Sequence, residues 1–132
     1  MTQRMTAAAF RLTAKRTWRD IEGPIHRDIL ARVKELLPDA VVHHSPNEVD
    51  LKGANVARAI SKQRWNGTRK GWPDLEILYQ GQFWTLEVKA PKKHPTTEQT
   101  ECGLDIVRAG GRWAVVRSVK EAEDIIEKWR SR

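Results

Sequence analysis

The amino-acid sequence predicts a single α/β domain, in which helices surround a central sheet. Three observations predict it: a hairpin of two apolar strands in the middle of the chain, a third apolar strand after it, and helical segments between and outside the strands. The 132 residues correspond to about one compact domain. The predicted order is α-β-α-β-β-α-β-α, an alternation typical of α/β folds.

The N-terminal part predicts a basic arm followed by a helix. Residues 1–19 show no sustained apolar period, so we expect a flexible arm there and a folded domain over residues 20–132. Apolar residues recur at spacings of three and four from Ile25 to Leu37, which is typical of an amphipathic helix. Pro38 ends it.

The next segments predict a short strand and a basic helix. Residues 40–42 are apolar and predict a strand that ends before a pair of histidines at 43 and 44. Turn-forming residues follow at 45–48. Residues 54–65 are basic and compatible with a helix, which an Asn-Gly pair then breaks.

The centre of the chain predicts the hairpin, and the C-terminal part a helix, a strand and a helix. Residues 75–79 and 83–90 form two strands joined by a tight connection at 80–82. A helix from Thr96 to Ala109 is followed by a glycine pair, Gly110 and Gly111, which we expect in left-handed conformation.

After these glycines, residues 113–116 predict a further strand. Ser118 and Glu121 form a capping box that opens the last helix.

The charge distribution predicts an anionic partner, most plausibly nucleic acid. The chain has 24 basic and 17 acidic side chains, a net charge of +7. Residues 51–73 carry six basic side chains, no acid and two tryptophans, Trp65 and Trp72. A solvated basic face without a partner is the alternative. The candidate nucleic-acid contacts, taken from this segment and from the end of the hairpin, are Lys62, Arg64, Arg69, Lys70, Lys92 and Lys93.

Two classes of protein are excluded. No apolar run approaches the ~18 residues of a membrane-spanning helix, and no signal peptide is visible, so we expect a cytoplasmic protein with no membrane contact. The single cysteine, Cys102, excludes an intramolecular disulfide and a cysteine-rich zinc cage. We expect Cys102 in the core.

The hairpin brings two carboxylates and a lysine together. Glu87 and Lys89 are two residues apart on a strand, so both project from the same face. A hairpin closed at residues 80–82 places Asp74 opposite Glu87 or Val88. Carboxylates this close repel one another and favour a hard divalent cation, Mg²⁺ or Mn²⁺. A surface network of ion pairs is the alternative.

These residues stand in an order that resembles the PD-(D/E)xK nuclease signature, and more specifically the VRR-NUC branch of that superfamily. The resemblance covers roughly residues 20–130. The matching features are Glu22, Asn47, Pro73-Asp74, Glu87-Val88-Lys89, Gln99, and the stretch from Gly110 to Ser118 with the acidic helix after it.

The resemblance implies a restriction-endonuclease-like mixed sheet, an αβββαβ core flanked by helices. By matching position, it makes Asp74 and Glu87 metal ligands, with the backbone carbonyl of Val88 as a further ligand. Lys89 becomes the catalytic lysine, and Gln99 supports the site.

Glu22 would complete the metal shell in this resemblance. His26 stands one helical turn after it, where the family often has a glutamine.

Several positions keep two explanations. Gln99 also fits a capping box with Thr96, and Glu22 also fits the favourable charge at a helix N-terminus. For His43 and His44 a structural or surface role is the stronger explanation. Trp65 and Trp72 fit base stacking or a subunit contact, and the lysines that follow the hairpin, with His94, fit either phosphate contacts or a solvated loop.

The function expected from these features is that of a Mg²⁺- or Mn²⁺-dependent endonuclease hydrolysing DNA phosphodiester bonds. The resemblance implies a homodimer acting on structured DNA such as four-way junctions. A non-catalytic DNA-binding or assembly module on the same fold is the alternative. An RNA nuclease on this scaffold is a third possibility.

Overall fold

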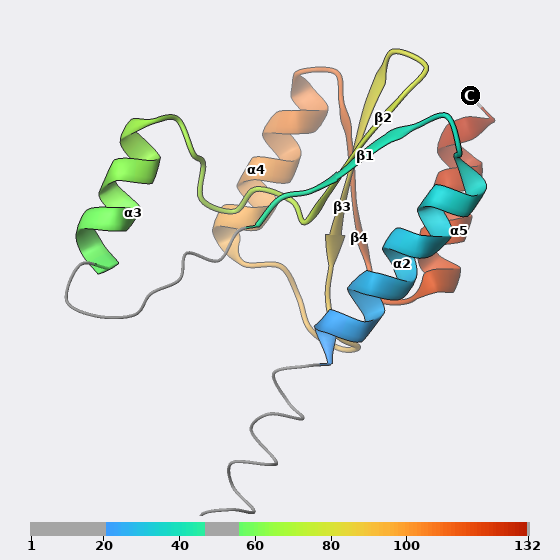
Figure 1. Ribbon diagram of the computed structural model, residues 1–132, viewed down its shortest axis with the longest axis horizontal. Helices are drawn as coiled ribbons and strands as arrows, with labels where there is room; N and C mark the ends of the chain where they lie inside the picture. The colour runs from blue at the N-terminus through green and yellow to red at the C-terminus, as the bar shows by residue number, and fades with distance from the viewer. Residues whose placement is uncertain (1–20, 47–55, 132) are drawn as a thin grey trace, which may run out of the picture.

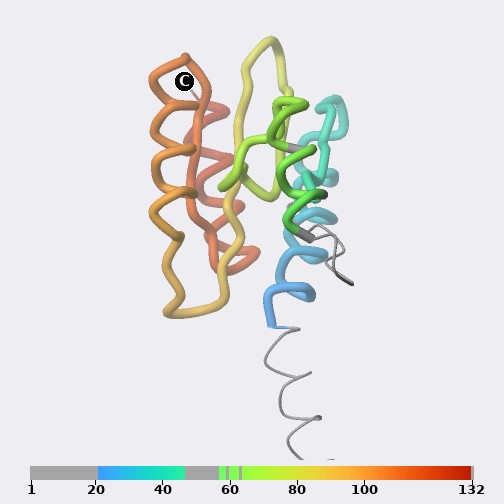
Figure 2. Tube along the Cα trace, turned by 90° about the vertical axis from the view of Figure 1, so that its left-hand side faces the viewer, coloured from blue at the N-terminus to red at the C-terminus, as the bar shows by residue number. Residues whose placement is uncertain are grey.

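The computed structural model describes residues 21–46 and 56–131, and these form a sheet with helices on both faces (Figures 1 and 2). The expected basic arm at residues 1–19 lies outside the described residues, as do Asn47 and Lys52. The described elements follow the predicted order α-β-α-β-β-α-β-α, which is confirmed.

The sheet is mixed and has four strands in the order β1-β2-β3-β4. The first three strands pair antiparallel and β3 pairs with β4 in parallel, which gives the αβββαβ core that the resemblance implied. The strands are β1 (Val41–His44), β2 (Leu75–Tyr79), β3 (Gln82–Val88) and β4 (Arg112–Val116).

Helices cover the two faces unequally (Figure 1). The helices α2 (Glu22–Leu36) and α5 (Val119–Arg130) pack against each other on one face, and α4 (Thr97–Arg108) packs on the other. The basic helix α3 (Val56–Trp65) stands apart from this body, on the side of the sheet where α4 lies.

The core lies between the sheet and the α2–α5 pair. Its members are buried apolar side chains of β2, β3, β4 and these two helices: Ile29, Val33, Leu37, Leu75, Ile77, Trp84, Leu86, Val88, Val116, Ala122, Ile126 and Trp129. On the α4 side Cys102 is fully buried, as expected, and the ring of Trp113 packs against Gly103. Both faces of β3 are therefore covered, and its polar residues Thr85 and Glu87 are buried.

The hairpin turn fixes the register that positions the candidate site. Gln80 and Gly81 both have positive φ, 48° and 76°, the conformation of a two-residue type I′ turn. This turn pairs Leu75 with Leu86, so Asp74, one residue before, comes next to Glu87.

Some predicted boundaries are wrong, and each has a local reason. β1 continues through both histidines because His43 pairs with Glu76 and His44 with Leu75 across the sheet. β3 ends at Val88 rather than at residue 90, although the next amide still bonds the carbonyl of Val116.

Two predictions about helix ends are confirmed only in part. Gly110 is left-handed with φ 103°, but Gly111 is not. Ser118 caps α5 by accepting from the Glu121 amide, whereas the Glu121 carboxylate accepts from the amide of Arg117 and so does not close the box.

No helix within residues 21–46 or 56–131 has both the length and the apolar composition required to cross a membrane.

Candidate active site

Asp74 lies at the start of β2 and is held from both sides. Its backbone carbonyl accepts from the amide of Ser45 (2.9 Å) and lies 3.1 Å from Nδ1 of His44. Its side-chain Oδ2 accepts from the amide of Val88 (2.8 Å). Asp74 is therefore fixed between β1 and the end of β3, which leaves little freedom to its carboxylate.

Glu87 projects from β3 toward α4 and is 1% exposed. Its Oε1 accepts from Nε2 of Gln99 (3.0 Å) and lies 3.9 Å from Nζ of Lys89. Its other oxygen, Oε2, is buried and has no donor directed at it among the described residues. A buried carboxylate oxygen without a donor is costly, and a cation is one group that would compensate it.

Burial also changes the acidity of this carboxyl. Loss of solvation, followed by the charge of the neighbouring Asp74 carboxylate, raises the pKa of Glu87 from 4.5 to about 9, against the opposing charge of Lys89. Two carboxyl groups close together in a low-dielectric environment cannot both ionise without a large cost in free energy. The pair is thus arranged to bind a positive charge.

Gln99 performs both of the roles that the sequence left open. Its side-chain Oε1 accepts from the backbone amide of Thr96 (2.8 Å). Its backbone amide donates to Oγ1 of Thr96, so the capping box is complete. Its Nε2 then points at Glu87. Because the cap uses the side-chain carbonyl oxygen, the NH2 group of the same side chain is oriented as a donor toward the carboxylate.

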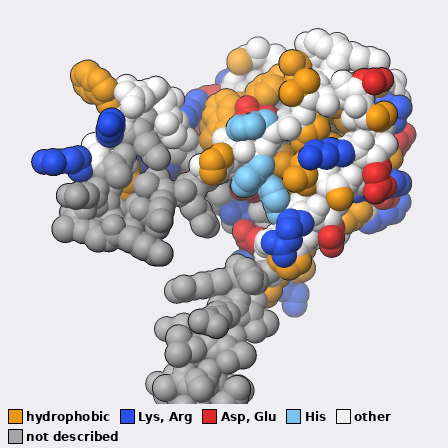
Figure 3. All heavy atoms as spheres, viewed as in Figure 1, with side chains coloured by type: hydrophobic (Ala, Val, Ile, Leu, Met, Phe, Trp, Pro, Cys, Tyr) orange, Lys and Arg blue, Asp and Glu red, His pale blue; other side chains and the backbone are white. Residues whose placement is uncertain are grey.

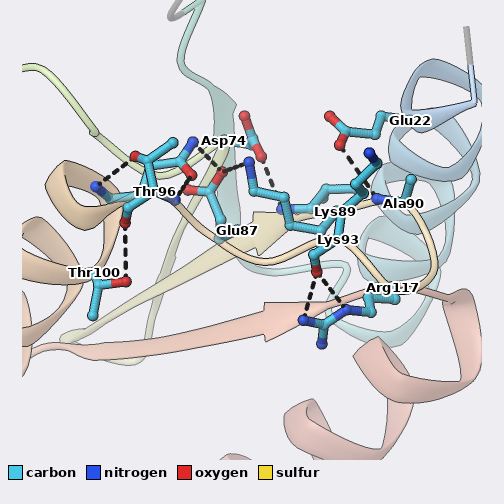
Figure 4. Close-up of polar contacts among 11 residues, drawn as sticks. Glu22, Asp74, Glu87, Lys89, Ala90, Lys93, Thr96, Thr100 and Arg117 are labelled. Carbon is cyan, nitrogen blue, oxygen red and sulfur yellow. Dashed lines mark hydrogen bonds and ion pairs between the residues drawn. The ribbon is translucent and has the colours of Figure 1, made fainter. Parts of the chain in front are cut away.

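Lys89 follows directly after β3 and lies on the same side as Glu87. Its side chain is 13% exposed, and Figure 4 shows it reaching back toward the Glu87 carboxylate, with Asp74 close by. The predicted convergence of Asp74, Glu87 and Lys89 at the open end of the hairpin is therefore present in the structure.

Glu22 approaches the same place from the first turn of α2, but its contact is different. Its Oε1 accepts from the amide of Ala90 at 3.3 Å, beyond the end of β3 (Figure 4). Within the part of the chain that the structure describes, no three His, Cys, Asp or Glu side chains form a ready-made metal cluster. Asp74 and Glu87 thus form the acidic pair, and Glu22 stands at its rim.

All these side chains line one cleft with a volume of about 780 Å³. His26 and His44 line it too, with their rings 4.4 Å apart in an edge-to-face arrangement. Burial is the largest cause that lowers the pKa of His26, followed by the charge of His44.

The sequence interpretation missed this pairing of imidazoles. The one available signal was the position of His26 one helical turn after Glu22. His43 instead faces away from the cleft and contacts Glu76 at 3.0 Å.

The predicted nucleic-acid contacts fall into two groups. Arg69 pairs with Asp105 and Lys70 with Glu98, so these two cations fasten their segment to α4. The others are exposed and have no ion pair among the described residues: Lys62, Arg64, Lys92 and Lys93.

No protein-family model and no curated protein matches the chain. Solved structures do match it, among them the following two. One, named "VRR_NUC domain", is 25% identical, has a TM-score of 0.57 and aligns 80% of this chain with 94% of its own length. Another, named "VRR_NUC domain protein", is 20% identical and shares the fold with a TM-score of 0.64 over 84% of this chain and 88% of that one. Together with the ordered motifs on this same fold, these matches support the VRR-NUC domain family for this chain.

Proposed function

We propose that this chain is a Mg²⁺- or Mn²⁺-dependent endonuclease that hydrolyses phosphodiester bonds in DNA. The observation that carries the proposal is the buried Glu87 carboxylate beside Asp74. One of its oxygens lacks a donor among the described residues, and Nζ of Lys89 lies 3.9 Å from the other. The fold and family support a PD-(D/E)xK arrangement of these three side chains.

The residues present fit a hard divalent cation. Such ions prefer carboxylate and carbonyl oxygens, and Asp74, Glu87 and the carbonyl of Val88 supply them at the end of the hairpin. Glu22 contributes negative charge at the rim of the same cleft. When bound, the ion polarises a phosphate oxygen and lowers the pKa of an attacking water.

The protein side chains orient the reacting groups. Gln99 donates to Glu87 and holds that carboxylate in one orientation, while the Val88 amide does the same for Asp74. Lys89 places a positive charge beside the acidic pair, where it stabilises the charge that develops on a phosphate during in-line attack. Lys92 and Lys93, exposed just after β3, are in place to bind the neighbouring phosphates.

For the substrate we propose structured or branched DNA, such as a four-way junction, bound by a homodimer. The net charge of +7 supports an electrostatic, shape-dependent interaction with the sugar-phosphate backbone.

The test is a cleavage assay on supercoiled plasmid, on four-way junctions and on an RNA of the same sequence, with Mg²⁺, Mn²⁺ or EDTA. Asp74→Ala and Lys89→Ala are expected to lower the cleavage rate at least ~100-fold, since each removes a group that acts in the transition state. Asp124→Ala and Lys120→Ala, an exposed ion pair on α5, are the matched controls and should cleave normally. Cleavage that persists in EDTA, or that neither active-site variant reduces, would reject the proposal.

A non-catalytic DNA-binding module is the second candidate. It is favoured by the contact of Glu22 with the Ala90 amide and by the lack of a ready-made three-ligand cluster among the described residues. Tight junction binding in EDTA, with no cleavage in either metal, is the result that supports it.

A further inference from the structure

The helix α3 presents an aromatic ring to solvent. Trp65, its last residue, is 91% exposed, more than any other exposed large hydrophobic side chain in the described residues. The helix packs extensively against no other described element, so no helix or strand of the described chain covers the ring. In Figure 3 this helix stands apart from the main body and carries basic side chains with a hydrophobic group at its end.

The same helical face carries unpaired positive charge. Residues three and seven positions before Trp65 fall on its side of the helix, and these are Lys62 and Arg58. Neither they nor Arg64 form an ion pair with any described residue. Seven residues of helix span roughly 10 Å, about three nucleotides of one DNA strand. The spacing thus matches phosphates along a strand with a base at its end.

The segment that follows α3, residues 66–73, is attached to α4 beside the cleft. The segment from α3 to Asp74 is attached to α4 by the pairs Arg69–Asp105 and Lys70–Glu98. Gly71, with φ 84°, lies so close to α4 that an added Cβ would be 2.5 Å from the Glu98 carbonyl oxygen, one residue before Gln99. The helix that carries the exposed ring is therefore connected to Asp74 by a short segment that is attached to α4.

We propose that Trp65 is a stacking site for an unpaired base of the DNA substrate, with Lys62 and Arg58 on the adjoining phosphates. This inference rests on the proposed function for the identity of the partner. An indole ring stacks on any base, whereas paired bases inside a duplex are inaccessible to it. Stacking on Trp65 therefore favours binding to DNA with a single-stranded gap or branch point over binding to intact duplex.

The test is fluorescence anisotropy in EDTA, so that no cleavage occurs, with a short duplex and the same duplex interrupted by a single-stranded gap. Trp65→Ala should weaken binding to the gapped DNA roughly tenfold and change binding to intact duplex by less than about twofold. Trp65→Phe should retain most of the affinity. With 2-aminopurine in the gap, wild type should quench its fluorescence and Trp65→Ala should not.

Leu78→Ala, which removes another exposed hydrophobic side chain on β2, is the matched control and should affect neither DNA. Equal effects of Trp65→Ala on both DNAs, or no effect, would overturn the inference. So would loss of a dimer by Trp65→Ala in sedimentation without DNA, because the ring would then be a subunit contact. Catalytic failure is distinguishable, since wild type would bind gapped DNA through Trp65 without cleaving it.

Discussion

Glu87 is the residue on which the proposed chemistry of the site depends. A carboxyl group that is almost fully buried is normally neutral, and burial here raises its pKa to about 9. At neutral pH and without a cation it therefore holds a proton, which a divalent ion would displace on binding. In the proposed function the ion would therefore bind Glu87 in competition with this proton, and its affinity should rise with pH.

This raised pKa predicts a specific pH dependence of stability. The folded protein holds the Glu87 proton up to about pH 9 and the unfolded chain releases it near 4.5, so the free energy of unfolding should fall as pH rises through that window. Urea unfolding should show that Glu87→Gln is more stable than wild type at pH 8, by up to a few kcal/mol.

Two controls make this measurement selective. Glu101→Gln, an exposed carboxylate on α4, should leave the pH slope unchanged. Mn²⁺ at pH 8 should stabilise wild type more than Glu87→Gln. A pH slope that is the same in wild type and Glu87→Gln contradicts the burial argument.

Gln99 links a helix cap to the site, and variants can separate the two roles. Gln99→Glu keeps an acceptor for the Thr96 amide but replaces the donor to Glu87 with a carboxylate oxygen, so cleavage should fall although the cap is retained. Thr96→Ala removes the other half of the cap and should cost about 1 kcal/mol of stability while activity is retained. Thermal unfolding and cleavage rates on the same samples check both. If Thr96→Ala lowers activity as much as Gln99→Glu, the cap and the site are not separable.

At the scale of elements, the hairpin places the acidic pair. Residue numbers alone predicted that Asp74 lies opposite Glu87 or Val88. The type I′ turn determines which residues of β2 and β3 are opposite one another, and it places Asp74 next to Glu87. The sequence did not predict that both faces of β3 are covered, because an alternation of apolar and polar residues along a strand indicates one buried face only. Burial of Glu87 depends on α4, whose packing is set by contacts such as Gly103 against Trp113 that lie far apart in the chain.

Gly71 and Gly67 offer a matched test of the attachment of α3 to α4. Both have positive φ, 84° and 98°, so alanine at either position should cost about 1–2 kcal/mol. At Gly67 an added Cβ meets nothing within 4 Å, whereas at Gly71 it meets the α4 backbone at 2.5 Å. Gly71→Ala should therefore be more destabilising by roughly 1–3 kcal/mol in urea unfolding and should reduce cleavage. Equal losses would show that this close approach is unimportant.

At the scale of the whole molecule, the element order and the sheet could be predicted because hydrophobic periodicity is local. The cleft could be predicted only in part. Asp74, Glu87 and Lys89 belong to one hairpin and were found from its register, whereas His26 and His44 come from two elements that only the tertiary fold brings together. The simultaneous contacts of Gln99 with the helix cap and with Glu87 could not be predicted either, since a capping motif does not show where the side-chain NH2 group points.

The positive charge of the molecule predicts a salt-dependent affinity for DNA. Lys93→Ala should reduce the slope of log affinity against log salt by about one, since this exposed lysine has no ion pair among the described residues. Arg69→Ala should change the slope less, because Arg69 is paired with Asp105. Binding to junction DNA in EDTA over a range of salt concentrations measures both. A larger change for Arg69→Ala would contradict the division of these cations into free and paired groups.

The most direct measurement is anomalous diffraction from a crystal of the protein soaked in Mn²⁺. The account predicts a peak within about 2.3 Å of carboxylate oxygens of both Asp74 and Glu87, and no such peak in Asp74→Ala. A manganese peak elsewhere, or none while both carboxylates remain accessible in the cleft, would contradict it.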